Sequence, residues 1–140
     1  MRRLLIPAAL LLLSACARPE ETPAPTIRFA SPEDGAVITG PVALQMEAEN
    51  IRVLPAGTFE DNSGHFHVVV DSPFITAGSV IPSDSLHIHF GDASTSGTLN
   101  LAAGTHTLRL QMGDGAHTAL EGLRDEVSIT VVAADSSGAE

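Results

Sequence analysis

The sequence predicts an all-β fold, a single immunoglobulin-like β-sandwich of about seven strands, with an open barrel as the alternative. Short segments alternate apolar and polar residues, and Gly and Pro turns separate them. Beyond the N-terminal segment, no run of ten or more residues follows the helical period, although residues 120–124 fit a single helical turn. The expected strands are residues 27–29, 42–49, 65–70, 86–90, 98–101, 105–112 and 126–132.

Residues 1–16 are predicted to form a lipoprotein signal peptide. Arg2 and Arg3 precede an apolar run over residues 4–13, which is too short to cross a bilayer. The run ends in Leu13-Ser14-Ala15-Cys16, which resembles the bacterial lipobox, whose cysteine receives lipid. An ordinary signal peptide that happens to contain a cysteine is the alternative. We therefore expect a membrane anchor on Cys16.

The residue after the cysteine is Ala17 and not Asp. By resemblance to lipoproteins of enteric bacteria, this favours the periplasmic side of the outer membrane. Residues 17–25 are rich in proline and read as an extended tether. Residues 26–134 would then form the β-sandwich domain, and residues 135–140 a small, polar, disordered tail.

Composition excludes several classes of function. The net charge is -10, and the chain has no lysine, so nothing in it suits the phosphates of nucleic acid. Cys16 is the only cysteine, which leaves the domain without a disulfide, a blue-copper thiolate or a cysteine nucleophile.

Two His-x-His pairs lie within strand patterns. Side chains at positions i and i+2 of a strand share a face, so His65 lies beside His67, and His87 lies beside His89. The residues between and around them are apolar and would face the core. If the two strands are neighbours, four imidazoles meet, and neutral imidazole is the commonest metal ligand in proteins. We expect a copper or zinc site here, with incidental surface histidines as the alternative.

Four further residues are weaker candidates. His106 is in phase with the core side of its expected strand, so a structural histidine and a ligand are equally good interpretations. His117 follows a Gly-Asp-Gly turn and becomes a ligand only if its loop folds over a histidine strand. Asp71 and Asp84 are expected to cap turns, or else to orient imidazoles from a second shell.

The order and spacing of these motifs resemble domain-of-unknown-function family 4399 over about residues 58–132. The motifs are Gly64-His65-Phe66-His67-Val68-Val69-Val70-Asp71, Ile81-Pro82-Ser83-Asp84, His87-Ile88-His89-Phe90-Gly91, Gly104-Thr105-His106-Thr107-Leu108, and Gly113-Asp114 with His117. The family's first motif usually carries three consecutive histidines, whereas this chain has Phe66 in the middle. The family continues with His or Pro after its last histidine, whereas this chain has Thr118-Ala119-Leu120. The resemblance implies that the six histidines act as a set.

Three functions follow from these features. The first is an envelope-anchored lipoprotein that binds copper or zinc through its histidines, for sequestration or delivery. The second is a non-catalytic interaction module with a protein partner in the cell envelope. The third is a zinc-dependent hydrolase, but such an enzyme needs a general base near the metal, and no Glu lies beside either His pair. We expect the first, and assign no catalytic residue.

Overall fold

The computed structural model describes residues 22–133, so the expected signal peptide with Cys16, most of the tether and the expected tail lie outside the described residues. Within that range the chain is built of strands, without a helix. The strands are β1 (Thr26–Ser31), β2 (Val37–Thr39), β3 (Val42–Glu49), β4 (Arg52–Val53), β5 (Ser63–Val70), β6 (His87–His89), β7 (Ser96–Leu99), β8 (Gly104–Gly113) and β9 (Ala119–Val132). The seven expected strands are all present, and β2 and β4 are additional short ones.

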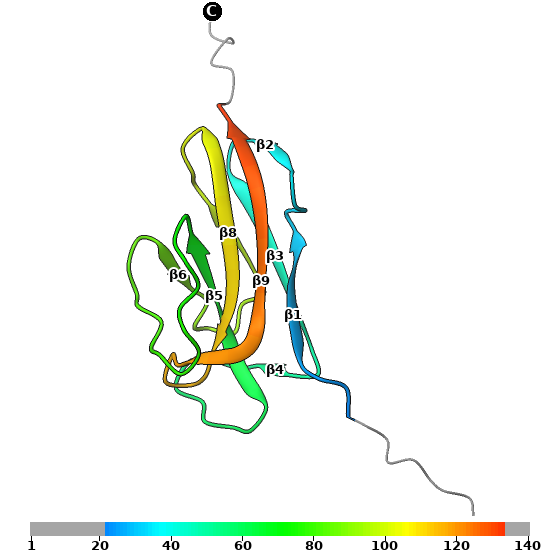
Figure 1. Ribbon diagram of the computed structural model, residues 1–140, viewed down its shortest axis with the longest axis vertical. Coiled ribbons are helices and arrows are strands. Elements are labelled where there is room, and N and C mark those ends of the chain that lie inside the picture. The colour runs from blue at the N-terminus through cyan, green and yellow to red at the C-terminus, as the bar shows by residue number, and fades with distance from the viewer. Residues whose placement is uncertain (1–21, 134–140) are drawn as a thin grey trace, which may run out of the picture.

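The strands form two sheets that pack face to face (Figure 1). The smaller sheet has the order β1-β3-β7, and the larger has the order β2-β9-β8-β5-β4, with β6 paired to β5. The core between them is aliphatic apart from three phenylalanines, Phe29, Phe66 and Phe90. The prediction of an all-β, immunoglobulin-like sandwich is confirmed.

Residues 120–124 correct one expectation, because they belong to β9 and not to a helical turn. Strand β9 starts at Ala119, and its Arg124 and Asp125 pair with Gln111 and Leu110 of β8. Pairing with β8 at Ala119, and again from Arg124 onward, holds this segment extended, which outweighs the weak local preference for a turn.

Strand β5 differs from an ordinary sandwich strand because both of its faces are buried. Phe66, Val68 and Val70 point into the core between the sheets. On the outer face His65 is 0% exposed and His67 is 1% exposed, and Val69 is equally covered. Outward-facing residues of a sandwich are normally solvated. A further layer must therefore cover this part of the larger sheet.

That cover is the loop of residues 71–86. The side-chain amide of Gln111 on β8 bonds both backbone groups of Ile75, and the guanidinium of Arg109 donates to the carbonyl of Ser72 at 2.8 Å. The ring of Phe74 lies against the guanidinium groups of Arg109 and Arg124, at 5.5 and 5.3 Å. These contacts hold the loop over the outer face of β8 and β9, next to β5.

Candidate metal centre

The register between β5 and β6 places the two His-x-His pairs side by side. His67 lies directly opposite His89, and Val69 lies opposite His87, in an antiparallel pairing. Opposed residues share a face of the sheet, and their Cβ atoms lie about 5 Å apart. The ring centroids of His67 and His89 are 5.0 Å apart. The predicted meeting of the two strands thus brings these two imidazoles together.

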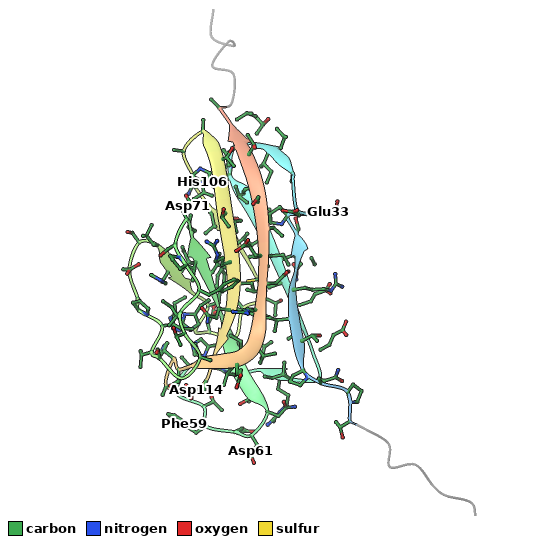
Figure 2. All side chains as sticks on the ribbon, in the orientation of Figure 1. Glu33, Phe59, Asp61, Asp71, His106 and Asp114 are labelled. Atoms are coloured by element: carbon green, nitrogen blue, oxygen red, sulfur yellow. The ribbon has the colours of Figure 1, made fainter. Side chains whose placement is uncertain are left out.

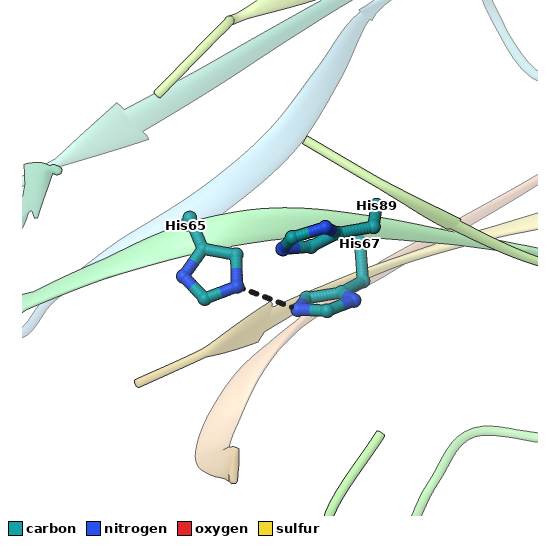
Figure 3. Close-up of side chains that lie close together, drawn as sticks. All are labelled: His65, His67 and His89. Carbon is teal, nitrogen blue, oxygen red and sulfur yellow. Dashed lines mark hydrogen bonds between the residues drawn. The ribbon is translucent and has the colours of Figure 1, made fainter. Parts of the chain in front are cut away.

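His65 completes a group of three. It lies two residues before His67 on the same face, and its ring centroid is 4.7 Å from that of His67 and 4.9 Å from that of His89. The Nε2 atoms of His65 and His67 are 3.0 Å apart (Figure 3). One ligand nitrogen from each of the three residues fits within 4.8 Å of the others, a spacing that a single metal ion can bridge.

His117 joins the group from the loop between β8 and β9. Its ring centroid is 4.7 Å from that of His89 and 4.9 Å from that of His65, and its Nε2 is 3.1 Å from Nε2 of His89. The loop folds over β5 because Gly113 pairs with both His65 and Ala119. The sequence made His117 a candidate ligand only if its loop folds over a histidine strand, and the loop does so. We call His65, His67, His89 and His117 the histidine cluster.

The backbone of His117 is held in an unusual conformation. Its φ is 64°, in the left-handed region that costs energy for any residue with a side chain. The carboxylate of Asp114 stabilises this turn by accepting the backbone N–H groups of Ala116 and Thr118, each at 2.8 Å. The His117 N–H donates to the Asp114 carbonyl at 2.9 Å. The loop is therefore built to aim one imidazole at the cluster.

Two glycines make room for the rings. A Cβ on Gly91 would lie 2.1 Å from Cε1 of His89, which is impossible without moving the ring. A Cβ on Gly113 would lie 3.0 Å from Nε2 of His67. The sequence pattern did not mark Gly91 and Gly113 as parts of the site, although both lie beside its histidine motifs.

The electrostatics of the cluster favour neutral rings at His65, His67 and His89. Burial, together with the neighbouring imidazoles, lowers the pKa of His65 from 6.5 to about 4 and that of His67 to about 3. Burial and His117 also lower the pKa of His89. Neutral imidazole has a free lone pair, so the cluster can donate to a metal at neutral pH without first losing protons.

Access to the cluster is one-sided. His65 and His67 are buried, whereas His117 is half-buried and His89 is exposed. An ion would therefore meet His89 and His117 first and the buried pair behind them.

His87 faces the same side as His67 and His89 but has a different partner. Its Nδ1 is 2.7 Å from Oδ1 of Asp84, and the ring is 7% exposed. The same oxygen of Asp84 accepts the backbone N–H groups of Leu86 and His87, at 2.9 and 3.1 Å. Asp84 thus combines the two roles expected for it, capping a turn and orienting an imidazole.

His106 lies apart from the cluster. Its Nδ1 is 2.7 Å from Oδ2 of Asp71, and its Nε2 is 2.8 Å from the carbonyl oxygen of Ala102. His106 is near the start of β8 and Gly113 is at its end, which separates the two by about 20 Å at the rise of a strand. Figure 2 shows His106 and Asp71 together, well away from Asp114. Both ring nitrogens of His106 are already bonded, so it has none free for a metal.

No helix among residues 22–133 is long and apolar enough to cross a bilayer. The fold and the cluster together define a class: a β-sandwich domain with four converging imidazoles on the outer face of its larger sheet. The family model described as "Domain of unknown function (DUF4399)" matches residues 44–132. The chain belongs to this family, and the matched region includes all four cluster histidines.

Other comparisons concern the fold. No curated protein matches the chain. Among solved structures, the endo-beta-1,4-mannanase from Thermotoga petrophila is similar, with a TM-score of 0.52 and 16% identity over 82% of this chain and 21% of the mannanase chain. The chain spans about a fifth of that enzyme, and the likeness shows the sandwich fold alone. The fibronectin(III)-like modules of Clostridium thermocellum CbhA match with a TM-score of 0.43 and 19% identity, over 77% of this chain and 98% of theirs.

Proposed function

We propose that this domain binds one copper or zinc ion through His65, His67, His89 and His117. The observation that carries the proposal is the convergence of four imidazoles from β5, β6 and the β8–β9 loop, with their Nε2 atoms meeting in pairs at 3.0 and 3.1 Å. Three separate parts of the chain contribute, so chance clustering within one motif does not explain it.

The spacing of the donor atoms fits such an ion. Metal–nitrogen bonds of 2.0–2.1 Å place adjacent donors about 3.3 Å apart in a tetrahedral site and about 2.9 Å apart in a square-planar one. The observed Nε2 pairs lie between these two values. Small rotations of the imidazoles would accommodate either geometry, so both zinc and copper are compatible with the donor positions.

The chemistry of the donor set narrows the choice of metal. Within the described residues, the hydrogen bonds of these four rings are with one another and not with carboxylates. Nitrogen donors suit zinc and copper, whereas magnesium, calcium and manganese prefer oxygen. The one-sided access suits uptake and release, which favours sequestration or delivery over permanent structural binding.

Burying the cluster histidines has an energetic cost, which the free energy of metal binding through their Nε2 atoms would outweigh. The Nδ1 atoms of His65 and His67 are buried and have no hydrogen-bond partner among residues 22–133. Each buried unpaired polar group costs about 1–3 kcal/mol. A fold selected for stability alone would place apolar side chains here. Metal binding explains why imidazoles are buried at these positions, whereas a plain interaction module does not explain it.

The test is calorimetric titration of the full chain, purified in detergent, with Cu(II) and with Zn(II) at pH 7.5. We expect His67→Ala to weaken binding by more than about 100-fold, beyond the effect typical of second-shell changes. The matched control is His106→Gln, which removes a histidine outside the cluster and should leave affinity unchanged. A hundredfold excess of metal over the dissociation constant should stabilise the fold by about 2.7 kcal/mol.

Two results would contradict the proposal. One is wild-type protein that binds neither metal more tightly than His67→Ala does. The other is a thermal midpoint that does not respond to either metal. In those cases the interaction-module function would take the place of metal binding.

We further propose that the protein is anchored in the bacterial envelope, with its domain on the periplasmic side of the outer membrane. The support is the lipobox-like segment ending at Cys16, and the Pro-rich residues that follow it. Cys16→Ser should release the protein from membranes or block its processing. Wild-type protein recovered in the soluble fraction, with a mature N-terminus other than Cys16, would refute the anchor.

A further inference from the structure

Three buried ring nitrogens on the outer face of the larger sheet are left over after the cluster is formed. They are Nδ1 of His65, Nδ1 of His67 and Nε2 of His87, and none of them has a hydrogen-bond partner among residues 22–133. Buried polar atoms are nearly always paired, so each unpaired atom requires an explanation.

Two of these atoms, Nδ1 of His67 and Nε2 of His87, belong to neighbouring residues of the sheet. His67 pairs with His89 and Val69 pairs with His87, so His87 is the diagonal neighbour of His67 on the same face. Diagonal neighbours lie within reach of long and aromatic side chains.

Asp84 determines which nitrogen of His87 carries the proton. Nδ1 of His87 is 2.7 Å from Oδ1 of Asp84, and an ionised carboxylate can only accept. Nδ1 therefore carries the hydrogen and donates it to Asp84. In the neutral ring, Nε2 of His87 is then a bare acceptor.

His67 offers the matching donor. As a ligand it would bind the metal through Nε2, the atom that faces His65, and its proton would then be on Nδ1. A metal-binding histidine commonly donates its other N–H to an orienting acceptor. The leftover donor of His67 and the leftover acceptor of His87 are complementary.

We propose that His87 is a positioning residue and not a ligand: its Nε2 accepts the Nδ1–H of His67 through one bridging water, in a chain Asp84–His87–His67 that orients the metal-binding ring. The role at the metal rests on the proposed function. The water-bridged link itself is expected in the metal-free protein as well. It explains why a histidine with no place in the cluster is buried beside it.

Two variants of His87 separate the parts of this chain. In His87→Asn the short amide reaches the position of Nδ1 and keeps the bond to Asp84, but the acceptor at Nε2 is lost. In His87→Gln the longer amide reaches the position of Nε2 and can offer its carbonyl to His67. Both variants are measured in the full chain. Each replaces the imidazole with a neutral amide, so the two variants have the same polarity and differ in whether an acceptor remains at the position of Nε2.

The first measurement is nitrogen-15 NMR of the imidazole rings in metal-free protein. His67 should be protonated on Nδ1 in the wild type and in His87→Gln, and should become a mixture of tautomers in His87→Asn. The second is titration with Cu(II), where His87→Asn should bind about 10–100-fold more weakly and His87→Gln should recover most of the loss. Pulsed electron paramagnetic resonance should count the same number of bound imidazoles in all three.

Each other outcome has a definite meaning. His67 protonated on Nε2 in the wild type, or full copper affinity in His87→Asn, would overturn the proposal. Fewer bound imidazoles in His87→Asn would make His87 a ligand, which also overturns it. If the wild type binds no metal but His67 is protonated on Nδ1 in a manner that depends on His87, the positioning bond is supported and the metal function fails.

Discussion

The histidine cluster and His106 belong to the same sheet, yet their rings have opposite surroundings. Both nitrogens of His106 face oxygen acceptors, at 2.7 Å from Asp71 and 2.8 Å from the Ala102 carbonyl. The bond to Asp71 raises the pKa of His106, because both contacts favour the doubly protonated ring. The cluster rings face one another, and burial lowers the pKa of His65 and His67.

The difference shows that the groups around a ring decide what a histidine can do. His106 is satisfied as a cation and ties the loop at Asp71 to β8, since Asp71 also accepts the backbone N–H of Thr107 at 2.8 Å. His65 and His67 in the cluster are neutral, and their buried Nδ1 atoms have no hydrogen-bond partner among residues 22–133. His106 therefore stabilises the fold, whereas the cluster is suited to binding at a cost in stability.

The largest expected effect is the response of metal-free protein to acid. Well above pH 6.5, His65 and His67 are neutral both in the folded and in the unfolded chain, so their full contribution to stability is present. As the pH falls below 6.5, His65 and His67 become protonated in the unfolded chain. In the folded chain they stay neutral until the pH approaches their lowered pKa values of about 4 and about 3. The free energy of unfolding should fall by up to about 1.4 kcal/mol per pH unit for each ring.

Urea denaturation in the presence of a chelator, between pH 7.5 and 5, measures this slope while carboxylates stay ionised in both states. The double variant His65→Gln/His67→Gln should flatten it. His106 has the opposite sign: its raised pKa adds stability that is complete below pH 6.5 and lost as the pH rises through the folded pKa. An unchanged slope in the double variant would mean that the buried rings do not resist protonation.

A pair of glycine variants separates damage to the cluster from damage to the core. In Gly91→Ala the new methyl group would meet His89, and in Gly97→Ala it would meet the ring of Phe90 at 2.7 Å. We expect Gly91→Ala to weaken metal binding by about tenfold with little loss of stability, because exposed His89 can rotate away. Gly97→Ala should cost about 1–3 kcal/mol of stability by overpacking, with affinity retained.

Chemical denaturation and metal titration of both variants provide the two readouts. Equal losses of affinity in the two would show that the site senses the core in general and not the space around His89.

The smallest expected effect belongs to His106. His106→Gln removes the charged bond to Asp71 and should lower the free energy of unfolding by about 1 kcal/mol at pH 6, where the ring is charged. Denaturant unfolding of His106→Gln, Asp71→Asn and the double variant measures the coupling between the two residues. Additive effects in the double variant would mean that the pair contributes nothing beyond its separate contacts.

The alternation of residues within each strand was sufficient to predict the sandwich and the shared face of each His-x-His pair. This works because side chains alternate with a period of two, so the local pattern alone decides which residues face the core. The phase of His106 with Leu108 and Leu110 left a structural histidine and a ligand equally open, and the structure places it away from the cluster with both ring nitrogens bonded. The same reasoning was wrong for residues 120–124, where pairing with β8 decides the conformation.

Three features depended on the folded molecule. The first is the register that sets His67 against His89, and the second is the turn that brings His117 over β5. The third is the cover on a face that a sandwich normally exposes to water: the loop of residues 71–86 bonds to Arg109 and Gln111, and the rings of His89 and His117 pack against His65. Register, loop path and cover arise from contacts between residues far apart in the chain, which no local pattern encodes. They decide whether these histidines are separate surface groups or one cluster.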